Sequence, residues 1–106
     1  MKYQIKKIFT GEIMYEGEAK SFKEFVEKNK SNLSNADLSN TDLSHTNLSH
    51  TNFSNTNLSY TDFSNSNFSY TDFSNSNLSY TNLFNAKIKI TQKEDLLKAL
   101  KIKIIN

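Results

Sequence analysis

Large apolar side chains recur at every fifth position through the middle of the chain. The series has twelve members: Leu33, Leu38, Leu43, Leu48, Phe53, Leu58, Phe63, Phe68, Phe73, Leu78, Leu83 and Ile88. A small residue, Thr, Ser or Ala, stands two positions before each of them, and Asn or Asp lies between the two except at Lys87. A period of five would spiral around an α-helix and would change face at every repeat of a plain strand. The pattern therefore predicts that each repeat forms one side of a coil and that the chain turns a corner after it.

The spacing within a repeat predicts which side chains face inward. The small residue and the large apolar residue are two positions apart, so they point the same way. Burying each large apolar side chain contributes about 1.5–3 kcal/mol, so this face must be the inner one. Asn or Asp and the Ser that follows the apolar residue then face outward. With four sides per coil, residues twenty apart stack, and the repeats make three coils. An inward Thr hydroxyl needs a partner, and we expect backbone carbonyls of adjacent coils to provide it.

The repeats resemble the pentapeptide repeat family, whose pattern is commonly written A(D/N)Lxx. Ala36-Asp37-Leu38 follows this pattern directly, and the resemblance extends from Ser31 to about Ile90. It implies a right-handed quadrilateral β-helix. The chain departs from the family in carrying Thr or Ser at most positions where the family prefers Ala. Some members mimic duplex DNA and bind topoisomerases such as gyrase, so the resemblance makes that mechanism available.

The segment before the repeats, residues 1–30, is expected to close the first coil. Residues 2–9 and 12–15 are predicted strands around a turn at Thr10 and Gly11, which together form a hairpin. Ser21 and Glu24 form the signature of a capping box, which predicts that a short helix begins there. Phe22, Phe25 and Val26 give this helix one apolar face. We therefore predict an N-terminal cap at 1–30 and the repeat β-helix at 31–90.

The segment after the repeats, residues 91–106, is expected to close the other end. Thr91 and Glu94 form a second capping-box signature. Residues 101–105 alternate Lys and Ile as an edge strand does, with lysines that discourage uncontrolled pairing. The apolar residues of this segment exceed what one small cap needs, and we predict that they form a homodimer. The dimerisation candidates are Leu96, Leu97, Leu100, Ile102 and Ile104.

Charge is distributed unevenly along the chain. Residues 1–30 carry seven Lys and five Glu, residues 31–86 carry four Asp without Lys or Arg, and residues 87–106 carry six Lys beside one Glu and one Asp. No segment approaches the roughly 20 apolar residues of a membrane span, and the first ten residues lack the apolar stretch of a signal peptide. We therefore expect a cytoplasmic protein without membrane association. Basic residues that are all Lys, together with abundant Asn and Ile, are typical of AT-rich bacterial or phage genes.

The outward aromatic residues are the main candidates for protein binding. Tyr60 and Tyr80 are twenty apart and share a corner column, and Tyr70 stacks above His50 on the opposite side. Exposed tyrosines favour protein interfaces, although stacking across coils that stabilises the fold explains them equally well. Asp42 and Asp62 lie on the face next to Tyr60. Phe84 stands where earlier repeats have Ser, and we expect it to pack beneath the C-terminal helix, with a subunit contact as the alternative.

Nothing in the sequence indicates an active site, a cofactor or a metal. Cys is absent, which excludes thiolate ligands, and His45 and His50 lack further ligands that would converge on them. Ser44 and His45 near Asp42 arise from the repeat itself rather than from a catalytic triad. We expect a non-enzymatic protein-binding module, for example a phage or bacterial inhibitor of a host macromolecular enzyme or defence complex. The alternatives are nucleic-acid binding through the Lys-rich tail and a purely structural or assembly role.

Overall fold

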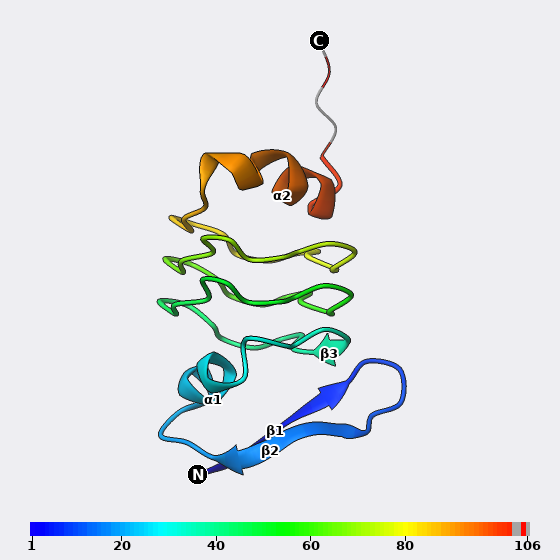
Figure 1. Cartoon of the computed structure of the whole chain (residues 1–106), viewed down its shortest axis with the longest axis vertical. Coiled ribbons are helices and arrows are strands. Elements are labelled where there is room, and N and C mark those ends of the chain that lie inside the picture. The colour runs from blue at the N-terminus through cyan, green and yellow to red at the C-terminus, as the bar shows by residue number, and fades with distance from the viewer. Residues whose placement is uncertain (103–104, 106) are drawn as a thin grey trace.

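The computed structural model describes residues 1–102 and 105. Its elements are β1 (Lys2–Lys7), β2 (Ile13–Glu18), α1 (Phe22–Lys28), β3 (Ala36–Asp37), the 3-10 helix η1 (Ile90–Gln92) and α2 (Lys93–Ala99). The β1–β2 hairpin and α1 lie at one end of the repeats, and α2 lies across the other end (Figure 1). Between them the chain winds back on itself in stacked rows.

The N-terminal hairpin forms as predicted, with strand ends that differ by a few residues. β1 and β2 pair antiparallel from Lys2 opposite Glu18 to Lys6 opposite Ile13, with a register shift after Ile5. Gly11 in the connecting turn has a φ of 71°, a conformation that glycine adopts without steric cost. β1 also pairs with β3, which gives the sheet order β2-β1-β3. The hairpin is thereby hydrogen-bonded directly to the second repeat.

Residues twenty positions apart pair in parallel throughout the repeats. Bridges join Asp42 to Asp62 and Asp62 to Asn82, and five further bridges have the same spacing. Apolar residues of the series also donate their N–H to the carbonyl nineteen positions later, as Phe53 does to Asp72 at 2.8 Å. This register is the one predicted for four repeats per coil, and it makes the region β-helix-like. We call residues 31–50, 51–70 and 71–90 the first, second and third layers.

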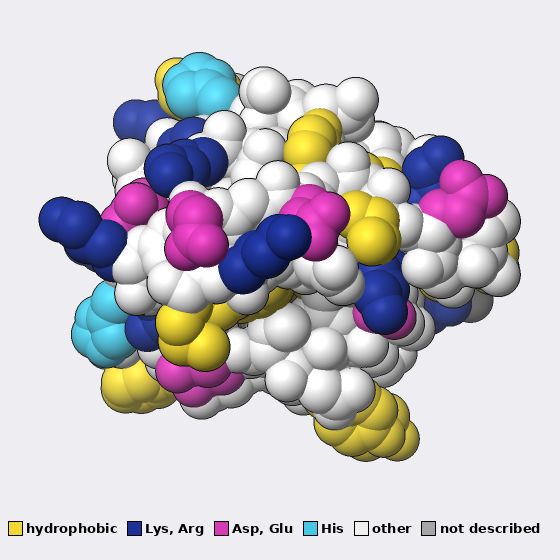
Figure 2. All heavy atoms as spheres, turned by 90° about the horizontal axis from the view of Figure 1, so that it is seen from below, with side chains coloured by type: hydrophobic (Ala, Val, Ile, Leu, Met, Phe, Trp, Pro, Cys, Tyr) yellow, Lys and Arg dark blue, Asp and Glu magenta, His cyan; other side chains and the backbone are white. Residues whose placement is uncertain are grey.

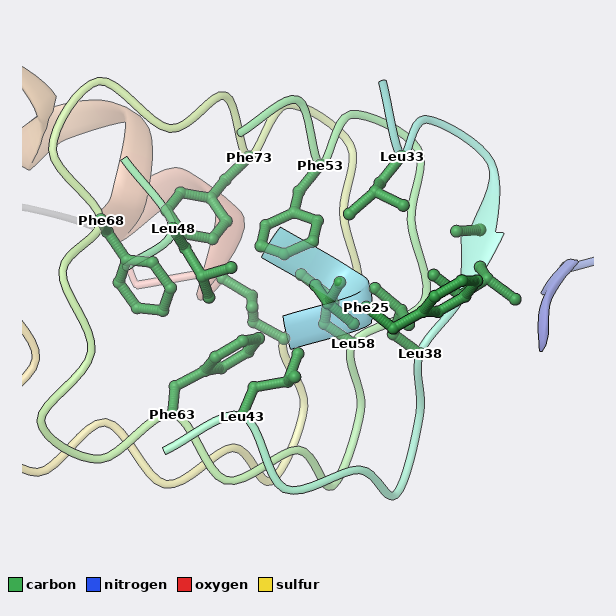
Figure 3. Close-up of a cluster of buried hydrophobic side chains, with 14 of the residues drawn as sticks. Phe25, Leu33, Leu38, Leu43, Leu48, Phe53, Leu58, Phe63, Phe68 and Phe73 are labelled. Carbon is green, nitrogen blue, oxygen red and sulfur yellow. The ribbon is translucent and has the colours of Figure 1, made fainter. Parts of the chain in front are cut away.

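The core is built from the apolar series (Figure 3). Its first ten members, Leu33 to Leu78, are all buried, and the last two, Leu83 and Ile88, are partly buried against them. Phe53, Phe63, Phe68 and Phe73 pack against one another, and the Phe63–Phe68 and Phe68–Phe73 ring centroids are each 4.9 Å apart at edge-to-face angles. Such aromatic pairs contribute roughly 0.5–1.5 kcal/mol beyond the area that they bury. The inward prediction for the series is confirmed.

The inward hydroxyls find carbonyl partners in two different ways. The Thr56, Thr61, Ser66 and Thr71 hydroxyls donate to the carbonyl twenty-three residues earlier, across to the neighbouring row, at 2.6–2.9 Å. The Thr41, Thr46, Ser76 and Thr81 hydroxyls instead donate to the carbonyl three residues earlier in their own layer, at 2.6–3.0 Å. Among the described residues the Thr51 hydroxyl is buried without a partner. The prediction of bonds between layers is thus correct for half of these eight hydroxyls.

Helix α1 covers the open end of the first layer. The Ser21 hydroxyl accepts the Glu24 N–H at 3.2 Å, so the predicted cap is present. Phe25 and Val26 are buried, and the Glu27 carboxylate accepts the Asn47 N–H at 2.9 Å. A carboxylate thus takes the place that a backbone carbonyl of a preceding layer would occupy.

The C-terminal end differs from the prediction in two respects. Thr91 does not cap a helix, because η1 already begins at Ile90 and no side chain caps α2. Residues 101–102 do not form a strand. The Lys101 N–H bonds to the Lys98 carbonyl (3.0 Å) and the Ile102 N–H to the Leu97 carbonyl (2.8 Å), a pair of bonds that terminates α2. Lys101 has the left-handed φ of 60° that such an ending requires. The rest of the predicted strand includes residues outside the described part of the chain.

Gln92 is the residue that attaches this end to the repeats. It is buried, and its Nε2 donates to the Phe68 carbonyl at 2.7 Å and to the Thr71 carbonyl at 3.2 Å. Its Oε1 accepts the Lys89 N–H at 2.8 Å. These bonds satisfy backbone groups at the edge of the repeats that would otherwise be buried without partners.

Candidate interaction surface

The corners of the repeats are left-handed turns held by the Asn or Asp side chains. In eleven repeats the Oδ1 atom of this residue accepts the backbone N–H two positions later, at 2.9–3.3 Å. The residue after that has a positive φ, from 55° to 70°, in all eleven corners from Asn35 to Asn85. Asn tolerates this conformation better than most residues. Sequence reasoning placed the corners but missed the conformation, for which Asn at six of the eleven positions was the available signal.

Five corners carry His or Tyr instead of Asn, and four of their rings stack in two columns. The rings of Tyr60 and Tyr80 lie 4.9 Å apart and 10° from parallel, and those of His50 and Tyr70 lie 5.0 Å apart and 18° from parallel. The Lys89 ammonium lies 5.8 Å from the centre of the Tyr70 ring. The two predicted pairs, Tyr60 with Tyr80 and His50 with Tyr70, are therefore confirmed. Stacking offsets part of the steric cost, about 1–2 kcal/mol, of placing a residue with a Cβ in the left-handed region.

The Tyr60–Tyr80 column remains open to solvent along the repeats. Tyr60 is 58% exposed and Tyr80 is 79% exposed, although each stacks on the other. Phe84, on the face that follows this corner, is 68% exposed. The expectation that Phe84 packs beneath the C-terminal helix is therefore wrong. The apolar residues that pack against the core from α2 are Leu96 and Ala99.

Asp42 and Asp62 stand one above the other on the same face as Phe84. They form a parallel bridge, which places the two residues in adjacent layers of one column. The Ser44 hydroxyl donates to Asp42 at 2.6 Å, and this bond is the main cause that holds the pKa of Asp42 below its usual value. Lys23 of α1 lies 3.8 Å from the Asp42 carboxylate. Asp62 accepts the Ser64 N–H at 2.9 Å. We call Tyr60, Tyr80, Phe84, Asp42 and Asp62 the aromatic–acidic surface.

The dimerisation candidates are divided between the core and the surface. Leu96 and Leu100 pack against the core of their own chain, and Leu97 is partly buried. Ile102 is 52% exposed. Ile104 lies outside the described residues. The homodimer stays a prediction, and the apolar area that α2 can offer it is smaller than the sequence suggested.

Side chains that could ligate a metal do not gather in one place among residues 1–102 and 105. No cluster of three or more His, Asp or Glu side chains within this part of the chain is arranged to hold a metal ion. Seen from the hairpin end, Lys and acidic side chains are interspersed rather than separated (Figure 2). The helices of the described chain are too short and too polar to cross a membrane.

The parallel twenty-residue register and the repeated corners define a β-helix-like repeat protein. A family model for pentapeptide repeats matches residues 31–69 and 56–89 in eight copies, which together cover more than half of the chain. The chain belongs to the pentapeptide repeat family. No curated protein and no solved structure matches the chain.

Proposed function

We propose that this chain is a non-enzymatic module that binds a protein partner through the aromatic–acidic surface. The observation that carries the proposal is the exposure of Tyr60 and Tyr80, at 58% and 79%, in a column that is already stacked and therefore rigid. A preordered aromatic pair loses little conformational entropy on binding. Tyrosine combines an apolar ring with a polar hydroxyl and is enriched at interfaces.

The partner we propose is a host macromolecular enzyme or a defence complex that the module inhibits. Recognition relies on shape, hydrogen bonds and aromatic contacts more than on charge. Duplex DNA has one negative charge per about 1.7 Å of its axis, whereas residues 31–86 carry four Asp in all. DNA mimicry is therefore the less supported mechanism, and a surface with rigid aromatic anchors is the better supported one.

The scaffold that we propose for this surface is a right-handed quadrilateral solenoid of three coils. Seven parallel bridges at a spacing of twenty residues support it. We assign residues 1–30 and 91–106 as caps, because the Glu27 and Gln92 side chains bond backbone groups at the two ends of the repeats. Capped ends keep a short solenoid soluble.

The test replaces the exposed ring pair and leaves the fold unchanged. A partner is first isolated with the full-length protein from the native host, and its affinity is measured by titration calorimetry. Tyr60→Ala with Tyr80→Ala should weaken binding by at least about 2 kcal/mol, the scale of an interface hot spot. Raising the salt concentration should reduce the affinity only slightly, because few charges meet.

The matched controls remove similar groups elsewhere. Tyr70→Ala deletes the same side chain from the other aromatic column, and Lys93→Ala with Lys98→Ala removes charge from α2. Both variants should bind as the unaltered protein does. Strong loss in the lysine variant, with steep salt dependence, would contradict the proposal and favour nucleic-acid binding through the C-terminal lysines.

A further inference from the structure

The backbone ladder of the repeats ends at an open edge in the third layer. One layer below, the Phe53 N–H donates to the Asp72 carbonyl (2.8 Å) and the Asn55 N–H donates to the Ser74 carbonyl (2.9 Å). Phe73 and Asn75 hold the same positions twenty residues later. Neither of their N–H groups has an acceptor in the part of the chain that the structure describes. Backbone donors left without a partner are a binding template, because each favours an acceptor strongly.

A groove runs beside this edge. Residues 71–76 form one wall, and Asp95, Lys98, Ala99 and Lys101 of α2 and its ending form the other. Its volume is about 680 Å³. Leu96, Ala99 and Leu100 pack α2 against the core, so the helix covers the interior and leaves the edge at 71–76 uncovered.

We propose that this edge binds an extended segment of a protein partner as one further parallel strand. The pairing between the second and third layers defines the register. There the N–H groups of Phe53 and Asn55 donate to two carbonyls that are also two residues apart, those of Asp72 and Ser74. In the partner, two such carbonyls would accept from Phe73 and Asn75. This is recognition by strand addition, in which the main chain provides affinity and side-chain pockets provide specificity.

The groove also indicates which side chains the segment carries. In the third layer, Phe73 lies between the two acceptor carbonyls of Asp72 and Ser74, points inward and is buried. The equivalent residue of the partner would point toward Phe73 and Ala99, so it should be apolar, with a polar residue on each side. The rim has two carboxylates, Asp72 and Asp95, and two ammonium groups, Lys98 and Lys101. This balance favours a segment without net charge, for example one with the sequence Asn-Leu-Ser.

The edge makes one contribution fewer than an inner row does. One layer down, the Thr51 carbonyl accepts the Asp72 N–H of the next row. The equivalent carbonyl at this edge, that of Thr71, already accepts from Gln92 Nε2 at 3.2 Å. The added strand is therefore bonded chiefly through the Phe73 and Asn75 donors. This site is separate from the aromatic–acidic surface, and it does not depend on the function proposed for that surface.

Amide hydrogen exchange of the full-length protein, followed by NMR, tests whether the edge is open. Phe53 and Asn55 are internal controls, because they have the same residue types at the same positions one layer down. The Phe73 and Asn75 amides should exchange at least about tenfold faster than these two. Equal protection of both pairs would mean that the edge is already closed and would overturn the proposal.

A synthetic peptide tests the occupant. The probe is fluorescein-labelled Thr-Asn-Leu-Ser-Asn, and the control peptide has Asp in place of Leu. The first should bind with a Kd below about 1 mM and slow the exchange of the Phe73 and Asn75 amides, and the second should bind at least about tenfold more weakly. Absence of binding by the first peptide, or binding that leaves these two amides unchanged, would overturn the proposal.

A pair of variants locates the site on the helix side. Ala99→Phe narrows the groove and should weaken binding of the probe at least about tenfold. Lys93→Phe places the same side chain on α2 outside the groove and should leave binding unchanged. Far-UV circular dichroism checks that both variants keep their helices. Equal affinity of the two folded variants would count against this groove as the site.

Discussion

At the scale of single residues, one repeat position can have two different hydrogen-bonding outcomes. Thr61 donates to the Leu38 carbonyl of the preceding layer at 2.9 Å, whereas the Thr51 hydroxyl is buried without a partner among the described residues. Both side chains are 1% exposed. The sequence around the two residues follows the same pattern, but the position twenty-three residues before Thr51 is Lys28 of α1, so no preceding repeat lies where Thr61 finds its acceptor. A buried hydroxyl without a partner costs about 1–3 kcal/mol, and one with a partner contributes about 1 kcal/mol.

This difference predicts opposite effects of the same substitution. Thr51→Val removes an unsatisfied hydroxyl and should raise the free energy of unfolding by about 1 kcal/mol. Thr61→Val removes a hydroxyl that is bonded and should lower it by about 1 kcal/mol. Urea denaturation of the two variants and the unaltered protein measures both changes. Equal shifts in the same direction would show that the Thr51 hydroxyl has an acceptor in solution.

At the scale of secondary-structure elements, the two ends of the repeats are closed by different chemistry. The N-terminal end is bonded by strands and by α1, with Lys6 of β1 paired to Asp37 of β3 and Glu27 of α1 bonded to Asn47. At the C-terminal end η1 and α2 follow the last repeat without any strand pairing among the described residues. In the part of this end that the structure describes, only Gln92 bonds to carbonyls of two earlier repeats. We infer that the docking of α2 depends more on one side chain than the docking of α1 does.

Replacement of Gln92 tests that inference. Gln92→Ala removes three hydrogen bonds of a buried side chain and should lower the free energy of unfolding by about 2 kcal/mol. Denaturant melts give the change, and amide exchange should become faster first in α2. Gln4→Ala is the control, because Gln4 also donates to a neighbour, Glu16, but is exposed. That control should change stability by less than about 0.5 kcal/mol. A similar small change for Gln92→Ala would contradict the inference.

At the scale of the whole molecule, apolar residues are exposed at both ends. Phe9 at the hairpin turn is 93% exposed, and Ile102 and Ile105 after α2 are 52% and 87% exposed. Leu96 and Leu100, which the sequence suggested for a dimer interface, pack mostly on their own core. If the chain associates through its C-terminal end, Ile102 and Ile105 are exposed apolar groups available for that contact.

The predicted homodimer can be examined by light scattering. The unaltered protein should show a mass near twice 12.2 kDa. Ile102→Lys should convert it to the monomer, because the substitution places a charge in an apolar contact. Phe9→Lys, at the opposite end, should leave the dimer intact. A monomeric mass for the unaltered protein at all concentrations would rule out the association.

Sequence alone was sufficient for what repeats locally. The five-residue period places Leu33 to Leu78 in the core. The twenty-residue register follows from the four sides per coil that the resemblance to pentapeptide repeats implies. The columns Tyr60–Tyr80 and His50–Tyr70 are direct consequences of that register. Ser21 was also recognisable as a helix cap, since capping bonds reach only three residues along the chain.

Only the tertiary structure decided the features that depend on contacts between distant residues. Gln92 donates to carbonyls 24 and 21 residues earlier. The Thr91–Glu94 signature, which considers only neighbouring residues, therefore predicted the wrong start for the C-terminal helix. Phe84 is exposed because α2 packs over the core through Leu96 and Ala99 instead of over the face that carries Phe84. The open edge at 71–76 exists for the same reason, since the path of α2 leaves it uncovered. A periodic sequence specifies how rows stack, but where the stack ends is determined by how the flanking segments pack on it.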